Sequence, residues 1–350
     1  MRNDDTVTIF FRALAITLSI AIITVALLYG AFLYFTKNMT GEVYNPNVSV
    51  NVEDEFIYEE AGENLKDNIK KWYDNGQPAK ADGVLNILLI GMDIDTKDMS
   101  KNSRADAMLL VSVNQNTKEI KMVSLLRDQY CYMVHKGKES YEKLHHANNY
   151  GGPEMQIDLI EKYYKISIDN YALVNFYSLP KIIDKMDGVT VSITKNEAEY
   201  MNTYWGTKVK TGENRLYGDT ALIYMRIRHQ TGGDTARVGR QQQVLKSIMN
   251  EVGAMNKGQL ISVISEMTKY VRTGYSSENL LSLATEAFVN GWFNYTVKNL
   301  SFPDETCAVD STINGAWYWL VDFPVAAQGL QRELFGKSNI VLLENREKWI

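Results

Sequence analysis

Four segments of this chain carry aspartates, three of them together with arginines, and these side chains suit the binding of a phosphate ester. The four segments are Gly91–Asp93, Arg104–Asp106, Ser124–Asp128 and Arg226–Gln241. Each borders a stretch too apolar to lie in water, and partly desolvated charges are costly unless a partner compensates them. Arginines bind phosphate oxygens and aspartates bind a divalent metal. These residues therefore indicate an enzyme that acts on phosphate esters.

Two aspartates flank apolar stretches that predict strands at 84–90 and 107–113. Asp93 follows the first strand, whereas Arg104 and Asp106 precede the second. If these strands are antiparallel neighbours, the three residues meet at one edge of the sheet, where open α/β sheets bind ligands. Taken singly, either aspartate is more simply explained as an ordinary turn residue.

Two further charged pairs are uninformative on their own. A strand predicted at 120–125 ends at Arg127 and Asp128, which is typical of a weak surface ion pair. Arg226 and Arg228 alternate with apolar residues, which is typical of a half-buried strand with a solvated basic side.

Residues 238–252 predict a helix with a single apolar stripe. The stripe consists of Val244, Leu245, Ile248 and Val252. At 3.6 residues per turn, Arg237 and Gln241 continue this stripe and Arg240 lies at its margin. Their polar groups therefore point inward near the N-terminal end of the helix, where free N–H groups and the helix dipole favour an anion. Arginine also suits bidentate phosphate contacts better than lysine.

Strands and helices alternate along the chain. After the strands at 84–90, 107–113 and 120–125, we predict a helix at 153–165, a strand at 171–176, a helix at 179–186 and a strand at 189–193. This alternation favours an α/β fold, which we expect to be a three-layer α-β-α sandwich around a mixed central sheet. Helical patterns recur between 258 and 288, whereas 300–350 predicts no clear elements.

An uncharged stretch at residues 13–35 predicts one N-terminal transmembrane helix. As a helix it would extend roughly 34 Å, enough to cross a hydrocarbon core of about 30 Å. Arg2 and Arg12 precede this stretch, so the positive-inside rule predicts a cytoplasmic tail at 1–12 and a catalytic domain outside the cell membrane.

The remainder predicts one extracytoplasmic domain on a stalk. Residues 36–83 are polar and acidic, and we expect them to form the stalk, with some helix around 62–73. We expect the catalytic core at 84–252 and a C-terminal part of the same domain at 253–350.

Composition excludes several classes of protein. A net charge of −5 and a pI near 5.6 argue against nucleic-acid binding. Nucleophile-elbow, Walker, dinucleotide-binding and zinc-protease motifs are absent from the sequence.

Cys131 and Cys307 either form a disulfide or remain buried thiols. Thiols are favoured because two cysteines far apart in the sequence make no disulfide framework. His145 and His146 are more simply local polarity than a zinc site.

Taken together, the charged segments resemble the LytR–CpsA–Psr (LCP) family of cell-wall glycopolymer ligases. The similarity covers 84–252 and keeps the order of the family's motifs. The matching segments are Asn86–Asp93, Arg104–Met108, Ser124–Asp128, Tyr150–Glu154, Asp187–Val189, Leu216–Arg228 and Asp234–Gln242. No single segment is specific, but seven in this order are.

The resemblance implies transfer of a phosphoglycan, such as teichoic acid or capsular polymer, from polyprenyl-pyrophosphate to peptidoglycan. In such enzymes arginines and Mg²⁺ (or Mn²⁺) hold the pyrophosphate, the lipid lies in an apolar groove, and a muramic acid hydroxyl attacks. A lipid-pyrophosphate pyrophosphatase and a non-catalytic membrane-anchored sensor remain as alternatives.

The resemblance also assigns roles to residues. Asp93 and Asp106 would hold the metal, one of Asp93, Asp106 and Asp234 would be the general base, and Arg127 would join them as a catalytic residue. The expected pyrophosphate-binding residues are Arg104, Arg127, Lys143, Arg226, Arg228, Arg237, Arg240 and Gln241. The chain departs from the family at Leu126, where proline is common, and at His145, where asparagine is usual.

Overall fold

The computed structural model describes 63–98, 102–227, 233–256, 258–259, 262–263 and 269–342, with only the backbone described at 233–235, 277 and 281. The chain divides into two compact units, 1–40 and 41–350, and every described residue lies in the second. Within the described residues, no helix has the length and apolar character needed to cross a membrane. The predicted membrane helix at 13–35 lies outside them.

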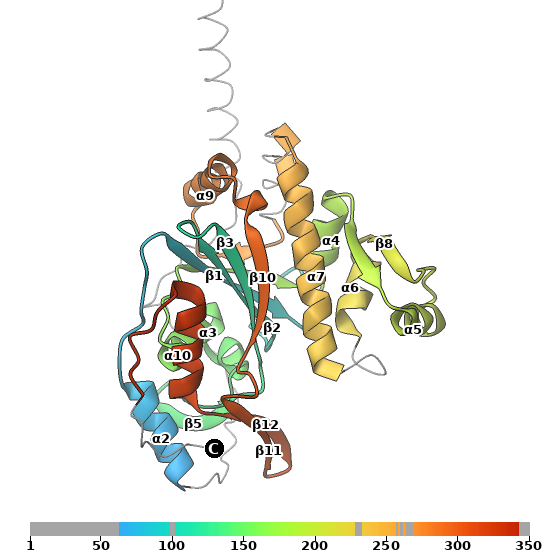
Figure 1. Cartoon of the computed structure of the whole chain (residues 1–350). Coiled ribbons are helices and arrows are strands. Elements are labelled where there is room, and N and C mark those ends of the chain that lie inside the picture. The colour runs from blue at the N-terminus through green and yellow to red at the C-terminus, as the bar shows by residue number, and fades with distance from the viewer. Residues whose placement is uncertain are drawn as a thin grey trace, which may run out of the picture. The chain divides into compact units, whose positions relative to one another are not determined.

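A six-stranded mixed sheet forms the centre of the second unit (Figure 1). In spatial order its strands are β10 (Thr296–Phe302), β3 (Glu119–Leu125), β2 (Ala105–Asn114), β1 (Val84–Met92), β6 (Asn170–Asn175) and β9 (Arg272–Thr273). β2 runs antiparallel to β1 and β3, whereas β6 is parallel to β1 and β10 is parallel to β3. The predicted mixed α/β sheet is therefore confirmed.

Helices cover both faces of this sheet (Figure 1). The helices α2 (Glu63–Asp74), α3 (His146–Tyr164) and α10 (Phe323–Phe335) pack on one face, and α7 (Gly233–Ala254) and α9 (Ser277–Val289) pack on the other. Successive residues of a strand point to opposite faces. Accordingly, Leu88 and Ile90 of β1 are fully buried under the first layer, whereas Leu89 is only half-buried under the second.

The helix predicted around 62–73 is present as α2, but it is part of the folded domain rather than of a stalk. Ile69 is completely buried, and the Tyr73 ring lies edge-on to Tyr132 with centroids 5.1 Å apart. Trp72 Nε1 donates a hydrogen bond to the Tyr163 carbonyl at 2.9 Å. The expected stalk boundary at residue 83 is therefore wrong, because an amphipathic helix within a polar segment can still bury its apolar side.

The C-terminal part completes the core, which does not end at residue 252. Both β9 and β10 are strands of the central sheet, and α10 packs on α3. Between them lies a hairpin of β11 (Ala308–Ile313) and β12 (Ala316–Val321). Its turn residues Asn314 and Gly315 have φ of 47° and 82°. Asn-Gly is a strong sequence signal for such a two-residue turn, and it marks a hairpin that our sequence analysis did not predict.

A small lobe packs beside α7. It consists of α4 (Ser178–Lys185), β7 (Val189–Ile193), α5 (Lys195–Trp205), β8 (Gly212–Leu216) and α6 (Gly218–Arg226). The lobe has its own core, in which Ala221 and Tyr224 of α6 are completely buried. The strand suggested by alternation around Arg226 is wrong: Tyr224 and Arg226 belong to the last turn of α6. A short run of alternating residues is compatible with a strand or with a helix. Here the buried Ala221 and Tyr224 are three positions apart, which is the spacing of residues on one side of a helix.

The remaining elements of the described chain are short. They are β4 (Tyr130–His135), β5 (Lys138–Lys143) and the 3₁₀ turn η1 (Trp292–Asn294). The helix predicted from Pro153 begins earlier, at His146, and is kinked at Gly152, where φ is 72°. Cys131 and Cys307 are both buried and free, as we expected.

Candidate active site

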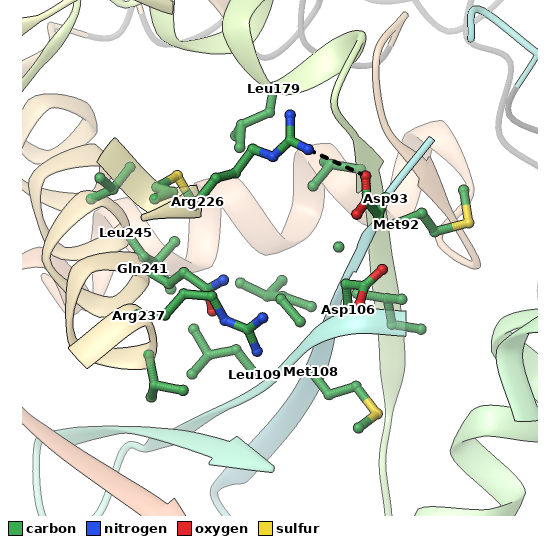
Figure 2. Close-up of a pocket in the computed structure, with 18 of the residues that line it drawn as sticks. Met92, Asp93, Asp106, Met108, Leu109, Leu179, Arg226, Arg237, Gln241 and Leu245 are labelled. Atoms are coloured by element: carbon green, nitrogen blue, oxygen red, sulfur yellow. Dashed lines mark ion pairs between the residues drawn. The ribbon is translucent and has the colours of Figure 1, made fainter. Parts of the chain in front are cut away.

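A cavity of about 430 Å³ lies between the sheet and the helices α7, α6 and α4. Its interior is apolar, and the half-buried leucines on the α7 side of the sheet face it. The apolar lining includes Leu89, Leu109, Leu179, Leu222, Val244, Leu245 and Ile248. One part of the lining, which we call the charged end, consists of Asp93, Asp106, Arg127, Arg226, Arg237 and Gln241. Figure 2 shows most of these side chains directed toward one common space.

The two aspartates reach the charged end because β1 and β2 are antiparallel neighbours. Gly91 pairs with Ala107, and a register shift follows before Met92 pairs with Ala105. A Cβ added at Gly91 would approach the Ala107 Cβ to 3.2 Å, so the strands are close here. Asp93 just after β1 and Asp106 at the start of β2 therefore share one edge, as the sequence predicted.

Each aspartate has an arginine partner. Arg127 donates a hydrogen bond to Asp106, and both side chains are about four-fifths buried. Asp93 Oδ1 lies 3.8 Å from Arg226 Nη2 (Figure 2), and both of these side chains are nearly half exposed. The Arg226 guanidinium also stacks over the Phe176 ring at 4.1 Å. Phe176 is a lining residue that sequence reasoning missed, although it is the last residue of the predicted strand at 171–176.

Arg237 and Gln241 project from α7 into the cavity (Figure 2). Arg237 is only 4% exposed, and it lines the same cavity as the apolar stripe residues Val244 and Leu245. The inward orientation predicted from helical periodicity is therefore confirmed. A buried guanidinium near the N-terminal end of a helix is well placed for an anionic ligand.

Lys143 lies next to the charged end but does not line the cavity. Its Nζ is 2.9 Å from Asp128 Oδ1, and Asp128 Oδ2 accepts a hydrogen bond from Arg127 Nε at 3.2 Å. Burial opposes ionisation of Asp128, but the hydrogen bond from Lys143 and the charge of Arg127 outweigh it and lower the pKa of this carboxyl. Asp128 stays ionised and holds Arg127 through Nε, while Nη1 of the same guanidinium donates to Asp106.

Arg240 does not face the cavity. It is 2% exposed, its Nη1 lies 3.0 Å from Glu197 Oε1 on α5, and its Nη2 donates to the Ile227 carbonyl. Arg240 is not among the residues that line the cavity, so the structure does not support its expected pyrophosphate contact. Successive residues of a helix are rotated by about 100° around its axis. The side chain of Arg240 therefore points toward the lobe, whereas that of the next residue, Gln241, points into the cavity.

Replacing Arg240 should affect stability. In Arg240→Met the Glu197 carboxylate keeps its burial and loses its partner, which typically costs about 3–5 kcal/mol. Urea unfolding of the variant should show this decrease in the free energy of unfolding. Arg332→Ala, at an exposed residue of α10, should change it by less than about 0.5 kcal/mol. Equal stabilities for both variants would contradict the structural role of the pair.

His145 holds the backbone that carries Arg127. Its Nδ1 lies 2.9 Å from the Arg127 carbonyl, and its backbone N–H donates to the same oxygen at 3.2 Å. Burial and the neighbouring His146 lower the pKa of His145 to about 3, so the ring is neutral and donates from Nδ1. The family's asparagine can donate the same hydrogen bond from its amide, and the departure at this position leaves the support of Arg127 intact.

The low pKa of His145 predicts a loss of stability in acid. The unfolded chain binds a proton at this histidine near pH 6.5, whereas the folded chain does so only near 3. The contribution of neutral His145 to the free energy of unfolding is therefore fully present above pH 6.5. It is lost as the pH falls toward 3, by up to about 1.4 kcal/mol per pH unit. His145→Asn should lose less stability between pH 7 and 4.5 in urea unfolding. Parallel losses in both proteins would show that this histidine does not titrate as stated.

Three further expected site residues have no described contact at the cavity. Arg104 is exposed and is not among the lining residues. Arg228 lies outside the described residues, and so does the side chain of Asp234, although its backbone belongs to α7. Their expected roles stay predictions.

The charged end has donors for a divalent metal when a phosphate ligand is present. Within the described part of the chain, no group of three or more His, Cys, Asp or Glu residues could hold a metal ion. Mg²⁺ commonly uses only one or two carboxylates together with phosphate oxygens and water. Asp93 and Asp106 fit that requirement in number and in chemistry.

The chain is similar in sequence and in fold to proteins of known name. TagU of Bacillus licheniformis, named a polyisoprenyl-teichoic acid–peptidoglycan teichoic acid transferase, is 28% identical over 270 residues, 72% of this chain and 86% of TagU. Regulatory protein MsrR of Staphylococcus aureus is 31% identical over 240 residues, 68% of this chain and 70% of MsrR. A structure described as TagT bound to LIIa-WTA shares the fold, with a TM-score of 0.59 and 22% identity, and the match covers 75% of this chain and 96% of TagT.

The match to the family extends over a longer part of the chain than the sequence motifs between residues 84 and 252. The LytR_cpsA_psr family model matches residues 47–333, which include α2, the whole central sheet and most of α10. The chain belongs to the LytR–CpsA–Psr family.

Proposed function

We propose that this protein transfers an anionic glycopolymer from a polyprenyl-pyrophosphate lipid to peptidoglycan, forming a phosphodiester. The observation that carries the proposal is one cavity with an apolar interior and a charged end of three arginines and two aspartates. A lipid pyrophosphate likewise consists of an apolar tail and a charged pyrophosphate group. The name of the relative TagU describes the same type of transfer, from a polyisoprenyl carrier to peptidoglycan.

The polyprenyl tail would occupy the apolar interior. Leu89, Leu109 and Leu245 line it and are only half-buried by the protein itself, so a lipid chain would complete their burial. Each buried methylene contributes about 0.8 kcal/mol. The pyrophosphate would then lie against Arg127, Arg226 and Arg237, where its negative charge is compensated.

The reaction requires one bond to form and one to break at phosphorus. The acceptor hydroxyl oxygen attacks the phosphorus nearest the glycopolymer, and the bond from that phosphorus to the bridging oxygen breaks. Polyprenyl phosphate leaves, and the glycopolymer stays joined to the acceptor through one phosphate. The protein contributes positioning and charge neutralisation, which dominate in phosphoryl transfer.

Asp93 is the residue that we assign to accept the hydroxyl proton. Its carboxylate is 45% exposed, and its contact to Arg226 is long, at 3.8 Å. Asp106 is held more tightly by Arg127. Asp93 therefore has an oxygen accessible to an incoming hydroxyl.

Mg²⁺ (or Mn²⁺) is the metal that we propose for this site, with Asp106 as its protein ligand beside the phosphate oxygens. When bound, the ion neutralises charge that develops on those oxygens. We further propose that residues 13–35 anchor the protein in the cell membrane with the catalytic domain outside, because the donor is itself a membrane lipid.

A transfer assay tests the proposal. The purified full-length chain in lipid nanodiscs is mixed with lipid-pyrophosphate glycan, peptidoglycan oligomers and Mg²⁺, and mass spectrometry looks for the phosphodiester-linked product. Asp93→Asn, Arg226→Ala and a sample with excess chelator are the controls. Product from the wild type alone, and only with metal, supports the transferase, the site and the metal together.

The other outcomes point to different functions. Release of glycan phosphate without a linked product would indicate a pyrophosphatase. Tight donor binding without consumption would indicate a sensor, a role consistent with the name of the relative MsrR. Transfer that persists in the chelated sample would remove the metal from the proposal.

A further inference from the structure

The β11–β12 hairpin is fastened to the segment that carries Arg127 and Asp128. The backbone N–H of Trp319 donates to the Asp128 carbonyl at 2.9 Å, and Trp319 also forms a β-bridge with Gln129. The second strand of the hairpin is therefore hydrogen-bonded to Asp128, the residue next to Arg127 of the charged end. Figure 1 shows it as a two-stranded projection beyond α10.

One side of this hairpin is packed on the protein. Tyr318 is 3% exposed, its ring lies edge-on to Tyr130 with centroids 5.1 Å apart, and Lys143 Nζ sits over it at 5.2 Å. Because side chains alternate along a strand, burial of Tyr318 turns its two neighbours to the opposite side. The orientation of that opposite side is thus set by the core.

The opposite side carries two tryptophans and two polar residues. Trp317 is 41% exposed, and its ring lies 5.1 Å from that of Trp319 at an angle of 74°. The cross-strand partners of these tryptophans are Thr312 and Asp310, both exposed. We call these four residues the tryptophan face. Trp317 is exposed, whereas Trp319 is half-buried against the core. An exposed tryptophan held beside a second indole is costly to leave in water and commonly marks an interaction surface.

We propose that the tryptophan face binds the glycan strand of the peptidoglycan acceptor. The inference rests on the proposed function, and it names the place where the acceptor lies. A polymer whose hydroxyl reacts at the charged end must continue across the adjoining surface, and the hairpin is fastened to that end. Indole rings cover the C–H faces of uncharged N-acetylated sugars, while Thr312 and Asp310 offer hydrogen bonds to their hydroxyl and amide groups.

The charge of the hairpin favours a peptidoglycan glycan strand over two other candidates near the site, the anionic glycopolymer of the donor and an anionic membrane surface. Neither β11 nor β12 contains a lysine or arginine, and Asp304, Glu305 and Asp310 are exposed on or beside the hairpin. An acidic surface repels an anionic glycopolymer donor and an anionic membrane surface. An uncharged sugar strand meets no such repulsion.

Co-sedimentation with peptidoglycan tests the proposal without requiring turnover. The full-length chain in nanodiscs is mixed with sacculi stripped of attached polymers, and the bound fraction is measured for wild type, Trp317→Ala and Trp205→Ala. Trp205 is the matched control, because it is an exposed tryptophan (54%) on α5. We expect Trp317→Ala to weaken binding roughly tenfold, as for loss of a central aromatic contact, and Trp205→Ala to bind like wild type.

The transfer assay supplies a second readout. Trp317→Ala should raise KM for the peptidoglycan acceptor roughly tenfold and leave KM for the lipid donor unchanged, and Trp317→Tyr should restore part of the loss. Unchanged sedimentation of Trp317→Ala, an equal loss in Trp205→Ala, or a raised donor KM would each overturn the proposal. If the wild type makes no product but the sedimentation difference remains, the proposed transferase fails and the glycan-binding face stands.

Discussion

Replacing Arg237 with alanine should reduce transfer by roughly 10²–10³-fold, the usual effect of removing one preorganised donor to developing charge. Arg237 is almost completely buried beside the apolar interior. Its charge therefore acts where little water screens it, and an electrostatic contact is worth more there than at the surface. The expected loss lies mainly in kcat, because charge on the leaving phosphate grows toward the transition state.

Steady-state transfer rates with the lipid donor check this expectation. Arg332→Ala is the control, because it removes an exposed arginine on α10 and should retain wild-type rates. Arg237→Lys should recover only part of the activity, since an ammonium lacks the bidentate geometry of a guanidinium. An Arg237→Ala variant that folds and transfers at the wild-type rate would remove Arg237 from the site.

Filling the apolar interior should block the lipid. In Leu245→Trp, an indole would replace a half-buried leucine of α7 that lines the cavity (Figure 2). If it displaces as few as two methylene groups of the polyprenyl chain, about 1.6 kcal/mol of burial is lost. We therefore expect KM for the long-chain donor to rise at least tenfold, with kcat little changed.

Comparison of donors separates a blocked cavity from general damage. A donor analogue with a short, water-soluble tail should be used almost equally by Leu245→Trp and by wild type, because it occupies less of the interior. Val289→Trp, at a 72% exposed residue of α9, should behave like wild type with both donors. An equal loss with long and short tails would place the lipid elsewhere.

Local patterns were sufficient wherever one element determines the direction of a side chain. The helical period alone predicted that Arg237 and Gln241 point inward, because neighbours on a stripe must share its environment. One predicted apolar strand ends shortly before Asp93, and the next begins directly after Asp106. The sequence therefore predicted that the two aspartates share an edge of the sheet if these strands are antiparallel neighbours. The structure supplies that condition through the β1–β2 pairing.

Long-range pairing was not readable from local patterns. β10 joins the sheet beside β3, 177 positions earlier in the chain, where Thr296 pairs with Glu119, and no local signal specifies such a partner. α2 reads as polar because only one of its sides is apolar, and its burial depends on surfaces supplied by α3 and β4. The expected core limits at 84 and 252 were wrong for these reasons.

The sequence by itself therefore determined the order of motifs, the class of fold and the inward side of α7, since each depends on residues close together in the chain. Only the tertiary structure decided which charges share a cavity. It pairs Arg240 with Glu197 on α5 and Lys143 with Asp128, and it brings Trp319 to the carbonyl of Asp128. An arginine has the same chemistry beside a phosphate or beside a carboxylate, so its role depends on the neighbour that folding places within reach.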